Sequence, residues 1–222
     1  MAKRGRTLAA IVLLIAVVLT LGALFLPWYS EQFSAFGLSE TQNAYLGLPT
    51  TNGTLQYTCS SNAPSCHAAS SSYSAQNLTH VGNLAEAGYL LIITDAVLGL
   101  LAVALAFASR NNPRRAGAAI ALGVLAMLIV IAAAGYFAVA LPGAIGSDSP
   151  GHTGSGPWSS FFGSSTNSGL SIAWGPAMGW YLSIGAFVLF LVGVVILARS
   201  RADPPAPAPA VVPSPAAAPA TQ

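Results

Sequence analysis

Residues 114–141 read RRAGAAIALGVLAMLIVIAAAGYFAVAL, and this stretch decides the fold. After Arg114 and Arg115 it contains no charged side chain. A helix that crosses about 30 Å of hydrocarbon needs roughly 20 apolar residues. Residues 116–141 therefore predict a membrane-spanning helix. Pro142 follows them and predicts the helix end, because proline cannot continue the helical hydrogen-bond ladder.

Three further stretches have the same character, at about residues 7–28, 87–109 and 177–198. Charged residues make up 6% of the 222 residues and hydrophobic residues 54%. A soluble domain carries roughly 25% charged residues, so this chain lacks the charge to cover a water-facing surface. We expect an all-α integral membrane protein, with a four-transmembrane-helix bundle over residues 1–201 that lies in a lipid bilayer.

The basic residues predict the orientation, because all of them lie just outside the predicted spans. They form three clusters: Lys3, Arg4 and Arg6; Arg110, Arg114 and Arg115; Arg199 and Arg201. Two spans separate each cluster from the next, so the three clusters lie on one side of the membrane. Basic flanks mark the cytoplasmic side. We expect a multi-pass protein of the cell membrane with cytoplasmic N- and C-termini and outer loops at about 30–84 and 143–175. The net charge of +2 gives no indication of nucleic-acid binding.

The first span could also be read as a cleaved signal peptide. Its apolar stretch is longer than the roughly 7–15 residues typical of signal peptides. It ends in Leu26-Pro27-Trp28-Tyr29, without a small-residue cleavage site. We therefore expect a retained span, with Trp28 in the aromatic belt of the membrane interface.

Small residues in the spans predict close contacts between helices. Ala119-x-x-x-Gly123 lies in the third span, and Gly175-x-x-x-Gly179 lies at the predicted start of the fourth. Such pairs allow two backbones to approach closely in lipid. They hold the bundle together, or alternatively offer a face for self-association or for another subunit.

Asp95 is the one ionisable residue deep in a span. Placing a carboxylate there costs about 3 kcal/mol, and such residues are functional candidates. It shares a helical stripe with Gly88, Gly99, Ala102 and Ala106, so we expect it to face the bundle. Without a cationic partner its neutral form is favoured. The hydroxyl groups at similar depth are those of Thr20, Tyr136 and Ser183, and we expect an intramembrane polar cluster. Its role is to lock helix register, to handle protons or ions, or to contact a partner.

The first outer loop is the only predicted extramembrane segment large enough for a folded element. Asn52-Gly53 between two extended segments is a hairpin signal, so we expect a small antiparallel β element. The loop also holds Cys59 and Cys66, the only cysteines. An oxidising compartment favours a disulfide between them.

The remaining polar motifs of the loops are weaker. His67, His80 and His152 are candidate metal ligands, but their spacing matches no recognised motif, and we expect neither a metal nor a cofactor. Asn52 and Asn77 begin glycosylation sequons. In the second outer loop, Trp158, Phe161 and Phe162 are expected to dip into the membrane interface, to pack on the sheet, or to contact a partner.

Residues 202–222 are almost wholly Ala, Pro, Val and Ser. Such a segment cannot bury a core, and we expect a disordered cytoplasmic tail with polyproline II character.

The Leu26-Pro27-Trp28 exit from the first span, the Cys59/Cys66 pair and the long first loop resemble the claudin/PMP22-like four-span membrane proteins. The resemblance implies a bundle that carries an extracellular sheet. The chain departs from the claudin pattern before Cys59, where it has Gln56-Tyr57-Thr58, so a barrier function is not carried over.

No nucleophile–base set or metal cluster is visible in the sequence, and we expect no enzyme. The favoured function is a non-enzymatic accessory, scaffold or interaction subunit that contacts a protein partner through its outer loops. The alternative is a small transporter or proton-coupled channel component that uses Asp95.

Overall fold

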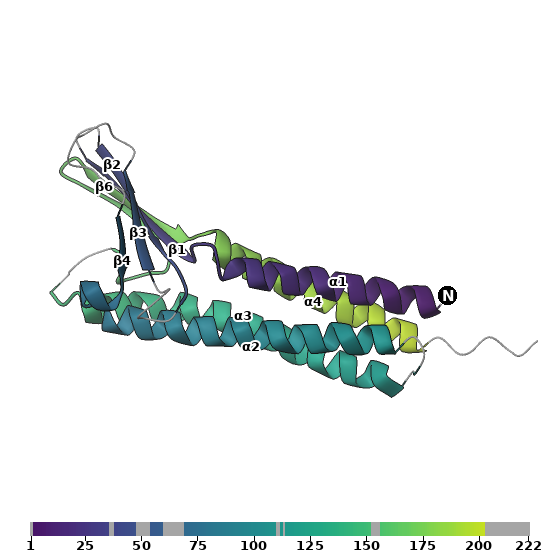
Figure 1. Cartoon of the computed structure of the whole chain (residues 1–222). Helices are drawn as coiled ribbons and strands as arrows, with labels where there is room; N and C mark the ends of the chain where they lie inside the picture. The colour runs from purple at the N-terminus through teal and green to yellow at the C-terminus, as the bar shows by residue number, and fades with distance from the viewer. Residues whose placement is uncertain are drawn as a thin grey trace, which may run out of the picture.

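A computed structural model describes residues 2–35, 38–47, 54–59, 69–109, 112, 114–151 and 156–202. The described residues form mostly helix, in four long α-helices: α1 (Ala2–Ala23), α2 (Thr79–Ala108), α3 (Arg114–Asp148) and α4 (Met178–Ala202). Each contains a stretch that is long and apolar enough to cross a membrane. The helices lie side by side, with the sheet at the end opposite the N-terminus (Figure 1). The prediction of a four-helix bundle is confirmed, and it indicates a multi-pass membrane protein.

The bundle packs through small residues. A Cβ added to Gly99 of α2 would lie 2.6 Å from Val17 of α1 and 2.9 Å from Phe190 of α4, which leaves no room for a side chain there. Gly123 of α3 is similarly close to Val194 of α4. Ala119 and Gly123 are both buried, so this predicted small-residue pair faces the bundle.

Several predicted boundaries are wrong. α2 begins at Thr79, well before residue 87. Pro142 lies inside α3, which continues to Asp148. The added turns of these two helices are tied together, since Asp148 accepts hydrogen bonds from the backbone N–H groups of His80 (3.0 Å) and Val81 (2.9 Å) at the start of α2. A carboxylate at a helix N-terminus satisfies N–H groups that have no partner in the helix.

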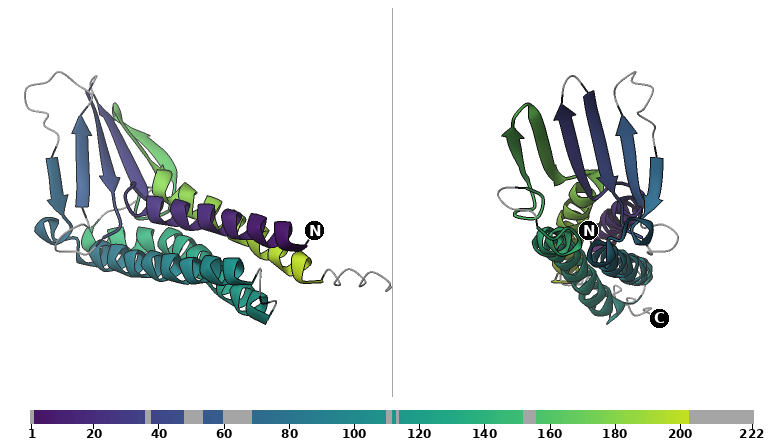
Figure 2. Two further views of the ribbon diagram at one scale, coloured as in Figure 1. Left: turned by 45° about the vertical axis from the view of Figure 1, so that its right-hand side comes forward. Right: turned by 90° about the vertical axis from the view of Figure 1, so that its left-hand side faces the viewer.

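A third boundary error concerns Gly175, which belongs to a strand. The described residues contain a six-stranded antiparallel sheet in the order β4-β3-β2-β1-β6-β5. Its strands are β1 (Tyr29–Ala35), β2 (Leu38–Ala44), β3 (Thr54–Cys59), β4 (Ala69–Ser72), β5 (Gly163–Asn167) and β6 (Leu170–Pro176). The small antiparallel element expected in the first loop is therefore present, but the loop between α3 and α4 adds two strands to it. Figure 2 shows the strands side by side above the helix ends.

The central strand β1 joins the two loops into one sheet. It pairs with β2 on one side, with Tyr29 opposite Ala44, and with β6 on the other, with Tyr29 opposite Pro176. The β5–β6 hairpin turns through Ser168 and Gly169, whose φ angles of 49° and 87° are both positive. Such angles are typical of the tightest hairpin turns.

The register gives the sheet two different faces. Because side chains alternate along a strand, residues paired across strands share a face. The face toward the helices carries the large or apolar side chains of Tyr29, Phe33, Ala44, Ile172 and Trp174, together with the polar side chains of Glu31, Gln42 and Glu40. The opposite face, called the polar face below, carries Ser30, Gln32, Ser34, Thr41, Asn43, Ser164, Thr166 and Ser171.

Trp28 locks the sheet to the bundle, and its predicted place in the interface belt is wrong. The side chain is fully buried, packs edge-on against Phe137 of α3, and donates from Nε1 to the Ala23 carbonyl at 2.8 Å. The Trp28 carbonyl accepts a hydrogen bond from Ala177 N, just before α4. The end of α1, the start of β1 and the start of α4 therefore meet at this residue.

Candidate functional site

Asp95 is buried in the bundle, as predicted. Gly88, Gly99, Ala102 and Ala106, which share its stripe on α2, are buried as well. Thr20 of α1 donates from Oγ1 to Asp95 Oδ2 at 2.9 Å, so the predicted contact between these two residues is confirmed. Within the described part of the chain, Asp95 Oδ1 accepts no hydrogen bond.

The other two hydroxyl groups of the expected cluster do not bind Asp95. Ser183 is buried and donates to the Gly179 carbonyl of its own helix at 3.1 Å. Tyr136 is 54% exposed, so its assignment to the cluster is wrong. Its neighbour Phe137 is buried against Trp28, and adjacent helical residues point about 100° apart. Burying Phe137 therefore turns Tyr136 toward the surroundings of the bundle.

The structure describes only some of the residues in the predicted loop motifs. β3 ends at Cys59, whereas Cys66, His67, His152 and Asn52 lie outside the described residues, so the Cys59–Cys66 disulfide remains a prediction. The predicted tail beyond residue 202 lies outside them too. Asn77, which begins one of the predicted glycosylation sequons, is exposed in a turn.

His80 is exposed, and its Nδ1 lies 2.7 Å from Asp148 Oδ1. This contact belongs to the connection between α2 and α3. Within the described ranges, no three His, Cys, Asp or Glu residues are grouped so that they could hold a metal ion.

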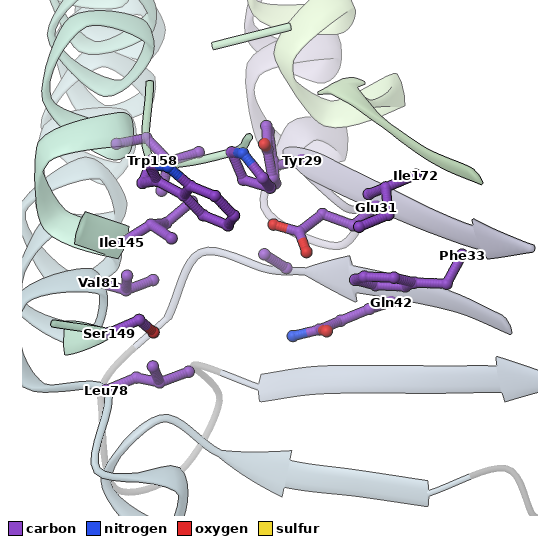
Figure 3. A pocket seen from close by; sticks show the side chains of 13 residues that line it. Tyr29, Glu31, Phe33, Gln42, Leu78, Val81, Ile145, Ser149, Trp158 and Ile172 are labelled. Atoms are coloured by element: carbon purple, nitrogen blue, oxygen red, sulfur yellow. The ribbon is translucent and has the colours of Figure 1, made fainter. Parts of the chain in front are cut away.

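A cavity of about 420 Å³, called the sheet cavity below, lies between the sheet and the ends of α2 and α3. Side chains from both loops and both helices line it: Tyr29, Glu31, Phe33, Gln42, Ala44, Leu78, Val81, Leu141, Ile145, Ser149, Pro157, Trp158 and Ile172. Figure 3 shows the Glu31 carboxyl group pointing into the space between the sheet and Trp158. The cavity exists because the two loops form one sheet that extends over the helix ends.

Glu31 is the ionisable group that distinguishes this cavity. It is half-buried on β1, between Tyr29 and Phe33 on the same face. Burial raises the pKa of the Glu31 carboxyl group from 4.5 to about 7. Burial, together with the neighbouring Glu31 charge, raises the pKa of the Tyr29 hydroxyl group well above its usual range, so this group stays neutral. Among the described residues, the buried Tyr29 hydroxyl oxygen has no hydrogen-bond partner.

Glu31 is not among the site residues predicted from the sequence. The alternation in Tyr29-Ser30-Glu31-Gln32-Phe33 is a strand signal that places Glu31 on the same face as two aromatic residues. This alternation does not show that α3 and Trp158, which follows α3 in the chain, lie across from that face.

The aromatic residues of the second loop were expected to dip into the membrane interface, to pack on the sheet, or to contact a partner, and their surroundings in the structure differ. Phe161 packs among Tyr29, Phe137 and Trp180, with ring centroids 5.7–6.3 Å away. It therefore fills the junction between sheet and bundle. Trp158 lines the sheet cavity, and Phe162 is 72% exposed.

Comparison of the chain with protein-family models and with curated proteins gives no match. Three features of the structure are therefore candidates for function: Asp95 in the bundle, the polar face, and the sheet cavity.

Proposed function

We propose that the chain is a non-enzymatic protein of the cell membrane, with cytoplasmic termini, that acts as an interaction subunit through its sheet. The orientation is supported by Arg4, Arg6, Arg114, Arg115 and Arg199, which lie at the end of the bundle opposite the sheet (Figure 1). The resemblance to claudin/PMP22-like proteins is also a proposal. It is supported by a sheet that begins directly after the first helix.

One observation carries the proposed role: the polar face carries no charged side chain in the described strands, and it ends in the edge strand β5. Gln32, Ser34, Ser164 and Thr166 are exposed on it. Burying uncharged hydroxyl and amide groups against a partner requires far less desolvation than burying ions. The edge strand β5 carries neither a charge nor a proline (Gly163-Ser-Ser-Thr-Asn167), and such residues usually keep exposed edges from pairing with other chains. β5 is therefore suited to receive a strand of a partner.

The edge can be tested by Thr166→Lys, which adds a charge to β5. Native mass spectrometry of the complex solubilised from its own membrane would measure the mass of the wild-type assembly and identify a homo- or hetero-complex. We expect Thr166→Lys to reduce the assembled fraction. Ala75→Lys is the matched control, because Ala75 is exposed beside β4 at the other edge. A wild-type protein that travels as a monomer, or equal effects of both variants, would contradict the proposal.

Asp95 supports a second candidate function, proton-coupled transport. The observation in its favour is a carboxylate oxygen that is buried in the bundle and accepts no hydrogen bond from the described residues. Proton flux into proteoliposomes would be compared for the wild-type protein and Asp95→Asn. Transport through Asp95 requires flux that this substitution abolishes; unchanged flux would exclude the role.

A further inference from the structure

We propose that the sheet cavity binds an amphiphilic organic cation, with the ammonium group beside Glu31 and the apolar part of the molecule against the ends of α2 and α3. This site is independent of the proposed contact through the polar face, because it lies on the other side of the sheet.

The charge of the cavity selects a cation. Glu31 is the only acidic side chain that lines it, and no Lys, Arg or His stands among the lining residues that the structure describes. A half-buried carboxylate without a cationic neighbour is neutralised by a proton or by a bound cation. The same charge disfavours anionic ligands, so the cavity favours positively charged molecules.

The aromatic lining selects an organic cation. Phe33 lies beside Glu31 on β1, and Trp158 faces Glu31 across the cavity (Figure 3). Ammonium groups are attracted to aromatic faces, and the attraction is largest for Trp. A metal ion is a poor match, because Ca²⁺ takes about 6–8 oxygen ligands and the cavity offers a single carboxylate.

The remaining walls require an apolar part in the ligand. Leu78 and Val81 of the α2 end and Leu141 and Ile145 of α3 line the side opposite β1. The volume of about 420 Å³ falls within the roughly 300–1,000 Å³ typical of small-molecule sites. A cation that carries an aromatic or short aliphatic group matches this combination. It can be a free molecule or the ammonium head group of a lipid, since both offer the same chemistry.

The test uses benzyltrimethylammonium and its neutral isostere neopentylbenzene, titrated by calorimetry into the full chain in maltoside micelles at pH 8. We expect the cation to bind the wild-type protein and Glu31→Gln to weaken binding about tenfold or more. Glu40→Gln is the matched control: Glu40 lies opposite Phe33 on the same face of the sheet, but it is exposed and does not line the cavity. It should bind as the wild type does. Equal affinity of Glu31→Gln and wild type, no binding of the cation, or equally tight binding of neopentylbenzene would overturn the proposal.

A second measurement needs no variant. Protonation of Glu31 removes its charge, so the wild-type affinity for benzyltrimethylammonium should fall as the pH decreases through about 7. Among the described lining residues, the titratable ones are Glu31 and Tyr29, and Tyr29 stays neutral. Of the nearby ionisable groups in the described residues, His80 and Asp148 lie 2.7 Å from each other, and Glu40 is exposed. An affinity that is the same at pH 5.5 and pH 8 would overturn the proposal.

The source of the ligand is distinguished by repeating the titration with phosphatidylethanolamine in the micelles. Competition that weakens benzyltrimethylammonium binding in the wild type assigns the site to a lipid head group. Unchanged affinity assigns it to a free organic cation.

Discussion

Replacing Glu31 with glutamine should stabilise the protein at high pH. The substitution keeps the size of the side chain and its place in the sheet cavity but removes the charge. In the folded protein burial raises the pKa of Glu31 from 4.5 to about 7. The folded state therefore binds this proton more tightly than the unfolded state does. The resulting stability is fully present below about pH 4.5 and is lost as the pH rises to about 7.

The magnitude follows from the size of this increase. At about 1.4 kcal/mol per pH unit, the change from 4.5 to about 7 corresponds to about 3 kcal/mol of lost stability at pH 8. A glutamine at position 31 does not ionise, so the variant does not lose this stability as the pH rises. For a chain of this length, a gain of that size raises Tm by roughly 6–12 °C.

Thermal unfolding in maltoside micelles at pH 5 and pH 8 measures the effect. We expect Glu31→Gln to raise Tm at pH 8 and to raise it only about a quarter as much at pH 5, while Glu40→Gln changes little at either pH. The same increase at both pH values would mean that packing, not charge, is responsible. No increase at pH 8 would refute the reasoning about burial of the carboxylate.

Three further substitutions test other parts of the fold. Gly179→Ala places a Cβ 2.6 Å from Trp28 Cδ1 and 2.7 Å from the Leu26 carbonyl, so thermal unfolding should show a loss of about 1–3 kcal/mol. Gly185→Ala in the same helix meets only Leu19 at 3.6 Å and should be neutral; equal losses would refute the steric argument. Thr20→Val leaves Asp95 Oδ2 without its 2.9 Å hydrogen bond and should cost about 1–3 kcal/mol in the same assay, whereas Thr94→Val, at an exposed site on α2, should cost much less. Replacing both Cys59 and Cys66 with Ser should remove a disulfide that stabilises the loop locally by about 2.5 kcal/mol. Hydrogen exchange in β3 should then be faster. A wild-type mass, measured under non-reducing conditions, that includes both thiol hydrogens would contradict the disulfide.

The bundle and the Asp95–Thr20 contact could be predicted because both depend on local patterns. Hydropathy identifies a span without knowledge of its neighbours, and helical periodicity places Asp95 among Gly88 and Gly99. The depth predicted from the span boundaries then places Thr20 at the same level. The same reasoning failed for Tyr136, since depth does not determine the direction of a side chain around the helix axis. That direction is determined by Phe137, which packs against Trp28.

The sheet and its cavity could be predicted only in part. The first-loop strands follow from extended, alternating segments. The pairing of β1 with β6, however, joins Tyr29 to Pro176, and no local pattern reports a contact between residues so far apart in the chain. Glu31 was missed for the same reason, because its significance depends on Trp158 and Ile145, which belong to other elements.

The position of β1 at the centre of the sheet has a consequence for biosynthesis. β1 and β2 leave the ribosome soon after α1, but β6, the other neighbour of β1, follows only after α2 and α3. One long edge of β1 therefore has no partner strand while most of the chain is being made. The last strand to be synthesised closes the sheet immediately before α4 is made. A nascent chain stalled before residue 170 should expose this edge to chaperones and proteases.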